Sequence, residues 1–237
     1  MSKQQTSGVP AIGAFFGVIG ITLVALSGLV LRFAWQNQPT PVDTWWHDLM
    51  AAQRSGPADV AAQFLNTFGG TLSMSLVTAA TVAVLLIVKR WREAITIGLT
   101  VALASGICTV LKILVARPRP LDGIVDVGSD SFPSGHTTTA AALTVAIAFA
   151  FPRVWTWALA GAWVASMALS RTYLLVHWTS DVLAAVALGA SVALLVSAIL
   201  TAIFGDGALV RNSLKKPSLA GRSFPGNEQA SIEKLSS

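Results

Sequence analysis

The stretch that decides the fold is VLAAVALGASVALLVSAILTAIFG, residues 182–205, in which no side chain carries a charge. A helix that spans a lipid bilayer needs about 20 such residues. Five more charge-free stretches of 17 residues or more precede it, at 4–31, 60–88, 94–111, 131–152 and 154–170. The pattern predicts an all-α polytopic membrane protein with six transmembrane helices in one bundle.

The composition agrees with a membrane protein. The 237 residues are 54% hydrophobic and 11% charged, whereas a soluble domain has about 25% charged residues. The net charge of +5 does not indicate a nucleic-acid partner, because cytoplasmic loops collect Lys and Arg. If the N-terminus lies inside, ten of the sixteen basic residues are cytoplasmic: Lys3, Lys89, Arg90, Arg92, Arg153, Arg211, Lys215, Lys216, Arg222 and Lys234. We therefore expect both termini in the cytoplasm. The small size and short loops of the chain indicate a bacterial protein, which we expect in the inner membrane.

The six expected helices cover residues 11–31, 70–88, 94–114, 134–151, 154–171 and 178–204. Gly13 and Gly17 form a pair of small residues that allows another helix to approach closely. The N-terminal apolar run is too long for a signal-peptide core, so we expect the first helix to be retained. The single cysteine, Cys108, cannot form an intramolecular disulfide. Residues 206–237 are predicted to be a disordered cytoplasmic tail, so residues 1–205 form one domain.

Two further segments lie between the first expected span and the second. Tryptophans at 35, 45 and 46 suit the headgroup level of a membrane, and a short interfacial helix is expected around 42–54. Its role is either to anchor the chain or to shape lipid access to a site. Residues 58–68 show apolar positions at helical spacing, and we expect them to extend the helix at 70–88.

Three polar clusters adjoin these apolar stretches, where a permanent charge is costly and needs a reason. They are Lys112-Ile-Leu-Val-Ala-Arg117-Pro-Arg119-Pro120, Pro133-Ser134-Gly135-His136, and Arg171-Thr-Tyr-Leu-Leu-Val-His177-Trp-Thr-Ser-Asp181. In the expected topology all three fall on the outer face. The sequence therefore predicts one extracytoplasmic site made from all of them.

The residue types in these clusters suit a phosphate ester. Lys112, Arg119 and Arg171 can neutralise its charge, the two arginines through forked hydrogen bonds. Ser134 and Gly135 stand at an expected helix start, where free backbone N–H groups and the helix dipole favour an anion.

The two histidines can divide the chemistry between them. His177 and Asp181 are four residues apart and face each other on a helical turn. A carboxylate on one ring nitrogen leaves the other nitrogen free as a nucleophile. His136 can then protonate the leaving oxygen and later activate water. This two-step route through a phosphohistidine needs no metal and no cofactor, because the cations stabilise the charge.

Plainer interpretations exist for each part taken alone. A lone histidine near a membrane interface is usually a polar contact, and an Arg-Pro pair marks a helix end. The combination, in this order and on one face, favours a catalytic site. The role of Arg117 is left open between contact with a substrate headgroup and binding of phospholipid, and we expect Asp130 and Ser131 to support the loop without acting in catalysis.

The motif Lys112-x6-Arg119-Pro120, then Pro133-Ser134-Gly135-His136, then Ser170-Arg171-x5-His177-x3-Asp181 resembles the three-part signature of the type 2 phosphatidic acid phosphatases. The resemblance implies a helical bundle with an outward-facing, metal-independent phosphatase site. It implies His177 as nucleophile, Asp181 as its partner and His136 as proton donor. It also implies a phosphate-binding set, namely Lys112, Arg119, Ser134, Gly135, Arg171 and Ser170. Soluble vanadium haloperoxidases share the signature, but the hydropathy of this chain argues against that activity.

The resemblance suggests a lipid phosphate as substrate. The bacterial candidates are undecaprenyl pyrophosphate, which we favour, phosphatidylglycerol phosphate and phosphatidic acid. Two alternatives are a phosphotransferase that uses the same phosphohistidine and a non-enzymatic transporter or scaffold. The sequence does not predict an oligomeric state.

Overall fold

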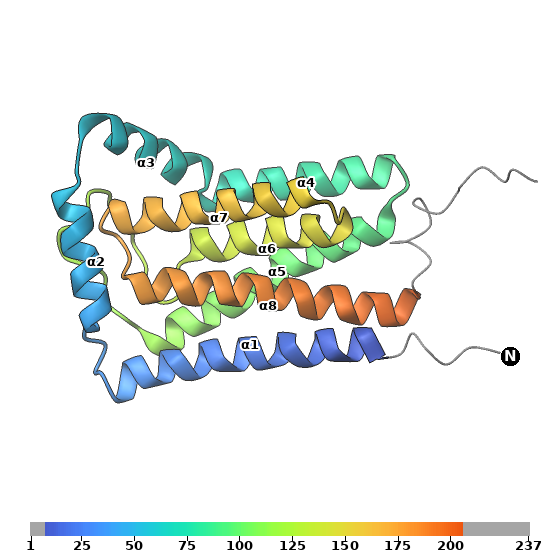
Figure 1. Cartoon of the computed structure of the whole chain (residues 1–237), viewed down its shortest axis with the longest axis horizontal. Coiled ribbons are helices and arrows are strands. Elements are labelled where there is room, and N and C mark those ends of the chain that lie inside the picture. The colour runs from blue at the N-terminus through green and yellow to red at the C-terminus, as the bar shows by residue number, and fades with distance from the viewer. Residues whose placement is uncertain (1–7, 206–237) are drawn as a thin grey trace, which may run out of the picture.

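The computed structural model describes residues 8–205, which form eight α-helices and no strand (Figure 1). The all-α prediction is confirmed, and the expected tail at 206–237 lies outside the described residues. The helices are α1 (Gly8–Phe33), α2 (Pro41–Ala52), α3 (Gly56–Phe68), α4 (Thr71–Ile87), α5 (Trp91–Val115), α6 (Gly135–Ala150), α7 (Val154–Tyr173) and α8 (Thr179–Phe204).

Local chemistry sets the helix ends beside the polar clusters. The last turn of α5 is followed by Ala116 in the left-handed conformation, with φ 51°. Pro118 and Pro120 then prevent the helix from continuing. At the start of α2, the Asp43 N–H donates to Thr40 Oγ1 at 3.2 Å and the Thr40 N–H donates to Asp43 Oδ2 at 3.0 Å. This reciprocal pair is a capping box, and it confirms the predicted short helix in this region.

Small residues let the long helices pack closely. Helix α6 lies in the middle of the bundle against α5, α7 and α8, and α1 packs along α8 (Figure 1). A side chain at Gly189 on α8 would come within 2.6 Å of the Thr138 carbonyl oxygen on α6. A side chain at Gly17 on α1 would come within 2.7 Å of Leu195 Cβ. The predicted close approach at Gly13 and Gly17 is thus confirmed, with α8 as the neighbour.

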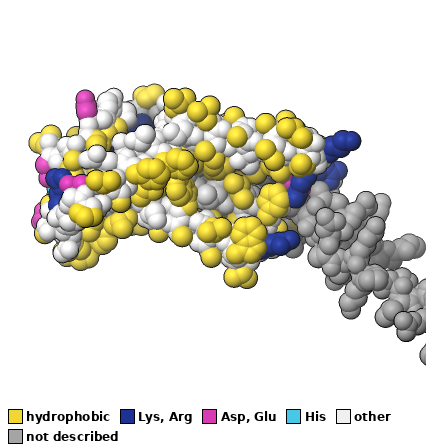
Figure 2. Space-filling model, turned by 90° about the horizontal axis from the view of Figure 1, so that it is seen from above, with side chains coloured by type: hydrophobic (Ala, Val, Ile, Leu, Met, Phe, Trp, Pro, Cys, Tyr) yellow, Lys and Arg dark blue, Asp and Glu magenta, His cyan; other side chains and the backbone are white. Residues whose placement is uncertain are grey.

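The outer surface of the bundle is strongly apolar. Figure 2 shows apolar side chains over the middle of one face and charged side chains gathered towards its two ends. Within residues 8–205, three helices are long and apolar enough to cross a membrane, at Pro10–Phe33, Trp91–Val115 and Thr179–Phe204. A fourth span is possible if α3 and α4 count as one bent span, and α6 is apolar but shorter.

The prediction that residues 58–68 extend the next helix is wrong. Helices α3 and α4 are separate and bend by 56° at the break. The physical reason is the pair Gly69-Gly70, because glycine is a poor residue for a helix interior. The Gly69 N–H closes α3 on the Leu65 carbonyl, and α4 begins after Gly70. The bend lays α3 against α7. There Met167 of α7 lies so close to Gly69 that a side chain at position 69 would not fit.

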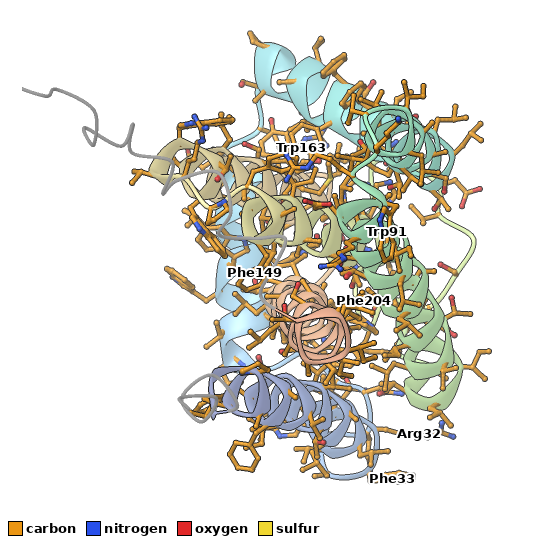
Figure 3. The ribbon with its side chains drawn as sticks, turned by 90° about the vertical axis from the view of Figure 1, so that its right-hand side faces the viewer. Arg32, Phe33, Trp91, Phe149, Trp163 and Phe204 are labelled. Carbon is orange, nitrogen blue, oxygen red and sulfur yellow. The ribbon has the colours of Figure 1, made fainter. Side chains whose placement is uncertain are left out.

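The helix ends form two groups, which lie at opposite ends of the bundle. The C-terminal ends of α5 and α7 and the first residues of α6 and α8 lie at the end that α2 covers (Figure 1). The start of α1 and the end of α8 lie at the opposite end. There Trp91 of α5 packs edge to face on Phe204 of α8, with ring centroids 5.2 Å apart (Figure 3).

Candidate active site

Backbone hydrogen bonds join the three polar clusters at the end covered by α2. The Ser134 N–H donates to the Asp181 carbonyl at 3.2 Å, which ties the start of α6 to the start of α8. The Ser131 N–H donates to the Arg117 carbonyl at 2.8 Å, which ties the loop after α5 to the segment before α6. These bonds join residues 47 and 14 positions apart in the sequence and bring the three clusters together, as the sequence predicted.

His177 lies at the centre of this region, in the turn between α7 and α8, with only 4% of its surface exposed. Its Nε2 atom is 2.9 Å from Arg119 Nη1, and its Nδ1 atom is 3.5 Å from Asp181 Oδ2. A guanidinium only donates hydrogen bonds, so Nε2 must present its lone pair and the ring proton lies on Nδ1. The 3.5 Å contact is longer than an ordinary hydrogen bond, so Asp181 orients the ring mainly by charge.

Burial keeps the His177 imidazole neutral. Complete burial is the largest influence, and together with the Arg119 charge it outweighs Asp181 and lowers the pKa of His177 to about 3. Near neutral pH the Nε2 lone pair is therefore available. In this structure the lone pair accepts a hydrogen bond from Arg119, a cation that can also donate to a phosphoryl oxygen.

Backbone carbonyls accept hydrogen bonds from two cations of the first cluster, Lys112 and Arg119. Arg119 Nε donates to the Ser129 carbonyl at 2.6 Å, and Arg119 Nη1 donates to the Val176 carbonyl at 2.6 Å. Lys112 donates to the Asp130 carbonyl. Both cations lie within electrostatic range of both predicted catalytic histidines. The prediction that Asp130 supports the loop agrees with these contacts.

The other two predicted site residues meet at a residue that the sequence did not indicate. His136 Nε2 is 3.3 Å from the Asn66 carbonyl, and Arg171 Nη1 donates to Asn66 Oδ1 at 2.6 Å. A carbonyl only accepts, so this ring nitrogen carries a proton. Arg171 is 1% exposed, and its Nη2 also donates to Ser170 Oγ at 2.9 Å. Helix α3 thereby orients both the predicted acid and a predicted phosphate ligand.

The start of α6 offers free donors, with one difference from the prediction. The Ser134 N–H is already bonded to Asp181, so it is not free for an anion. Within the described residues, the N–H groups of Gly135, His136 and Thr137 have no hydrogen-bond partner. They belong to the first turn of a helix, where an anion is favoured. A side chain at Gly135 would have no neighbour within 4 Å, so space is available there.

Arg117, whose role was open, lies in a buried ion-pair network. Its side chain is 0% exposed and pairs with Asp43 at 2.8 Å and with Asp181 at 2.7 Å. The structure thus gives Arg117 a role that neither sequence-based alternative included, as the bridge between two carboxylates. Asp43 was not predicted as a site residue. Its only signal in the sequence was its place three residues after Thr40, at the start of the expected interfacial helix.

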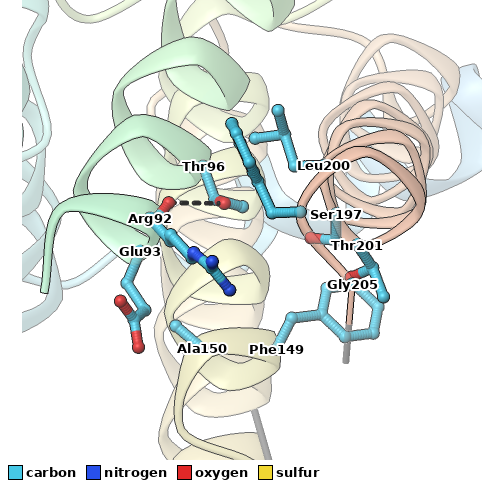
Figure 4. Close-up of a pocket in the computed structure, with 10 residues that line it drawn as sticks. Arg92, Glu93, Thr96, Phe149, Ala150, Ser197, Leu200, Thr201 and Gly205 are labelled. Carbon is cyan, nitrogen blue, oxygen red and sulfur yellow. Dashed lines mark hydrogen bonds between the residues drawn. The ribbon is translucent and has the colours of Figure 1, made fainter. Parts of the chain in front are cut away.

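A separate hollow of about 50 Å³ lies at the opposite end of the bundle, between α5, α6 and α8 (Figure 4). Its lining includes Arg92, Glu93, Ser197 and Thr201, and none of the predicted site residues. Within residues 8–205, no three His, Cys, Asp or Glu side chains are grouped where they could hold a metal ion. The third histidine, His47, is half-buried with its Nε2 3.0 Å from Asp122 Oδ2.

Part of the chain is similar to a known protein family. A family model described as the PAP2 superfamily matches residues 93–204. The decaprenylphosphoryl-5-phosphoribose phosphatases of two Mycobacterium tuberculosis strains, CDC 1551 and H37Rv, are 40% identical to this chain over 118 residues. That match covers 47% of this chain and 63% of each relative, so the chain spans less than two thirds of their length.

Two solved structures have a similar fold. A transmembrane PAP2 type phosphatidylglycerolphosphate phosphatase from Bacillus subtilis superimposes with a TM-score of 0.66 at 22% identity, covering 82% of this chain and 97% of that one. LpxE from Aquifex aeolicus superimposes with a TM-score of 0.60 at 18% identity, covering 66% of this chain and 95% of that one. Residues 93–204, slightly less than half of the chain, are therefore similar to the PAP2 superfamily, and the chain shares the fold of these two solved structures.

Proposed function

We propose that this protein is a metal-independent lipid phosphatase that works through a phosphohistidine on His177. The observation that carries the proposal is the setting of His177, whose Nε2 lone pair faces Arg119 while Nδ1–H faces Asp181. A neutral, oriented imidazole beside a cation is the arrangement that nucleophilic attack on a phosphate ester requires. We also propose that α1, the bent α3–α4 pair and α5 to α8 form six spans, with the site outside and both termini in the cytoplasm.

In the first step, His177 Nε2 attacks phosphorus, an N–P bond forms, and the bond from phosphorus to the leaving oxygen breaks. His136 supplies the proton that the leaving oxygen needs. The phosphoryl oxygens offer Arg119 a charged acceptor in place of the neutral ring nitrogen, so Arg119 turns from His177 to the phosphate. Lys112, Arg171 and the free N–H groups at the start of α6, from Gly135 to Thr137, complete the binding of the phosphate charge.

In the second step, a water molecule attacks the phosphohistidine. His136 takes the proton of the water, the N–P bond breaks, and inorganic phosphate leaves. Asp181 favours the positive charge that the His177 ring carries while it is phosphorylated. No step is assigned to a metal ion, and assays in EDTA test that part of the proposal.

For the substrate we propose a polyprenyl-linked phosphate. A site at the outer membrane–water boundary, where we propose to place it, suits a lipid whose phosphate reaches water, and the 40% identical relatives carry a name that specifies a decaprenylphosphoryl sugar phosphate. Undecaprenyl pyrophosphate, favoured from the sequence, belongs to the same lipid class. Phosphatidylglycerol phosphate and phosphatidic acid are the non-prenyl alternatives.

The test is a panel of purified lipid phosphates assayed in detergent and EDTA, with release of inorganic phosphate as the readout. Decaprenylphosphoryl-5-phosphoribose, undecaprenyl pyrophosphate, phosphatidylglycerol phosphate and phosphatidic acid form the panel. We expect the wild type and His47→Ala to release phosphate and His177→Ala to release none. Release that needs an added divalent metal, or an active His177→Ala, would refute the mechanism. Labelled phosphate on a lipid or sugar acceptor would indicate a phosphotransferase instead.

A further inference from the structure

A fully buried ionic network connects the interfacial helix α2 to the candidate nucleophile. Arg117 donates from Nη2 to Asp43 Oδ2 at 2.8 Å and from Nη1 to Asp181 Oδ1 at 2.7 Å. All three side chains are 0% exposed. One guanidinium therefore bridges two carboxylates that belong to helices 138 residues apart in the sequence, α2 and α8.

Ser180 adds further bonds between the same two helices. Its N–H donates to Asp43 Oδ1 at 2.8 Å, and its hydroxyl donates to Asp43 Oδ2 at 2.9 Å. Arg117 Nη1 also donates to the Ser180 hydroxyl at 2.7 Å. Burial favours the neutral acid at Asp43, but bonds from Arg117, Ser180 and Thr40 outweigh it and lower the pKa of Asp43. Asp43 is therefore ionised at neutral pH.

Such a network is not expected to contribute much to the stability of the fold. Removing charges from water is costly, and a buried ion pair is often no more stabilising than apolar side chains of similar size. Two carboxylates beside one guanidinium also leave one negative charge in excess. The cost suggests a role beyond packing α2 against α8.

The network fixes the rotation of the Asp181 carboxylate. Its Oδ1 atom is occupied by Arg117. Its Oδ2 atom accepts the Trp178 N–H at 2.9 Å and is the atom that faces His177 Nδ1. If Arg117 shifts, Oδ1 loses its partner and the carboxylate can turn away from the imidazole.

We propose that Asp43 and Arg117 are positioning residues that hold Asp181 towards His177, so that α2 helps to orient the nucleophile. This inference rests on the proposed function, because it needs His177 to be the attacking group. Within residues 8–205, neither side chain is hydrogen-bonded to a predicted phosphate-binding residue, so the effect should fall on kcat and leave KM nearly unchanged. A displacement of a catalytic group by about 1 Å can cost about a hundredfold in rate.

The experiment is a double-mutant cycle with purified full-length protein in detergent, using p-nitrophenyl phosphate as the probe. Asp43→Asn and Arg117→Lys are each measured alone and in an Asp181→Asn background, with kcat expressed per folded protein from size-exclusion chromatography. Arg117→Lys keeps the charge but cannot hold both carboxylates with a planar fork. Glu93→Gln is the control, because Glu93 is also buried and ion-paired, at 2.7 Å to Arg90 at the opposite end of the bundle.

We expect Asp43→Asn and Arg117→Lys each to lower kcat by about 10- to 100-fold with KM within about twofold of wild type. In the Asp181→Asn background, neither change should lower kcat by more than about twofold, because the group they position is already gone. Equal losses in both backgrounds, or a wild-type kcat for Arg117→Lys or Asp43→Asn, would overturn the inference. A wild-type kcat for Asp181→Asn itself would instead overturn the proposed function.

Discussion

The Asn66→Ala variant tests whether α3 orients Arg171, a predicted phosphate-binding residue of the site. The change removes the amide oxygen that accepts the Arg171 Nη1 hydrogen at 2.6 Å. It leaves the Asn66 backbone carbonyl, which faces His136 Nε2. The variant therefore separates the orientation of Arg171 from that of the predicted acid.

The expected magnitude follows from the burial and charge of this contact. Arg171 is 1% exposed, and within the described residues its Nε atom has no hydrogen-bond partner. Without the Asn66 amide, the Ser170 hydroxyl is the one remaining hydrogen-bond partner of the guanidinium in the described part of the chain. A hydrogen bond to a charged group contributes about 1.5–3 kcal/mol, and about 1.4 kcal/mol corresponds to a tenfold change in rate. We therefore expect kcat/KM to fall by about 10- to 150-fold.

The assay measures phosphate release from a lipid phosphate in detergent, together with inhibition by orthovanadate. Because Arg171 is proposed to bind the phosphoryl group, the half-inhibitory vanadate concentration should rise with the loss of kcat/KM. Gln63→Ala is the matched control, since Gln63 lies one turn earlier on α3, is exposed, and its side chain makes no hydrogen bond in the described structure. It should behave as wild type.

A wild-type kcat/KM together with wild-type vanadate inhibition for Asn66→Ala would refute the reasoning. If kcat/KM and vanadate inhibition both stay within about twofold of wild type, the Arg171 contact to α3 has no part in phosphate binding. If Gln63→Ala loses as much activity as Asn66→Ala, the loss comes from disturbing α3 and not from the lost amide.

Three further predictions follow from packing, protonation and charge. Gly189→Ala would place a methyl group 2.6 Å from the Thr138 carbonyl oxygen, and thermal melting should show a loss of about 1–3 kcal/mol; Gly161→Ala, with nothing within 4 Å, should be neutral or stabilising by up to about 1 kcal/mol, and equal melting of both would contradict the packing. The pKa of His177 is lowered by burial from 6.5 to about 3, so the unfolded chain binds more protons in that window and stability should fall as the pH drops from 6.5 towards 3; His177→Asn should flatten the dependence of melting temperature on pH, and an unchanged slope would contradict it. Arg119→Lys keeps the charge but loses the fork, so vanadate should inhibit about tenfold less well, and unaltered inhibition would rule out the contact to phosphate.

The long helices could be predicted because charge-free stretches leave little choice of structure. Residues 94–114 were expected to be helical, and the helix is Trp91–Val115. The prolines at 118 and 120 explain why that end was clear. The continuity of α3 and α4 was predicted wrongly, because apolar spacing on both sides of Gly69-Gly70 gives the same signal for a straight helix and a bent one.

Some residues of the candidate site could likewise be predicted from the sequence, and others could not. The signature residues could be found because their types and spacing suit phosphate chemistry, and their catalytic roles stay predictions. Asn66 and Asp43 could not be found, since each acts through a contact with a residue more than seventy positions away in the sequence. An asparagine on an amphipathic helix and an aspartate in a capping box have ordinary local explanations. Only the packing of α2 and α3 over the end of the bundle gives them a place in the site.

The central claim is that His177 carries the phosphoryl group during turnover, and rapid-quench labelling tests it most directly. The wild type is mixed with a lipid phosphate labelled with ³²P, quenched in alkali within milliseconds, digested and mapped by mass spectrometry. The account predicts an acid-labile label on the peptide that contains His177, and no label in His177→Ala. A label on another residue, or full turnover by His177→Ala, would contradict it.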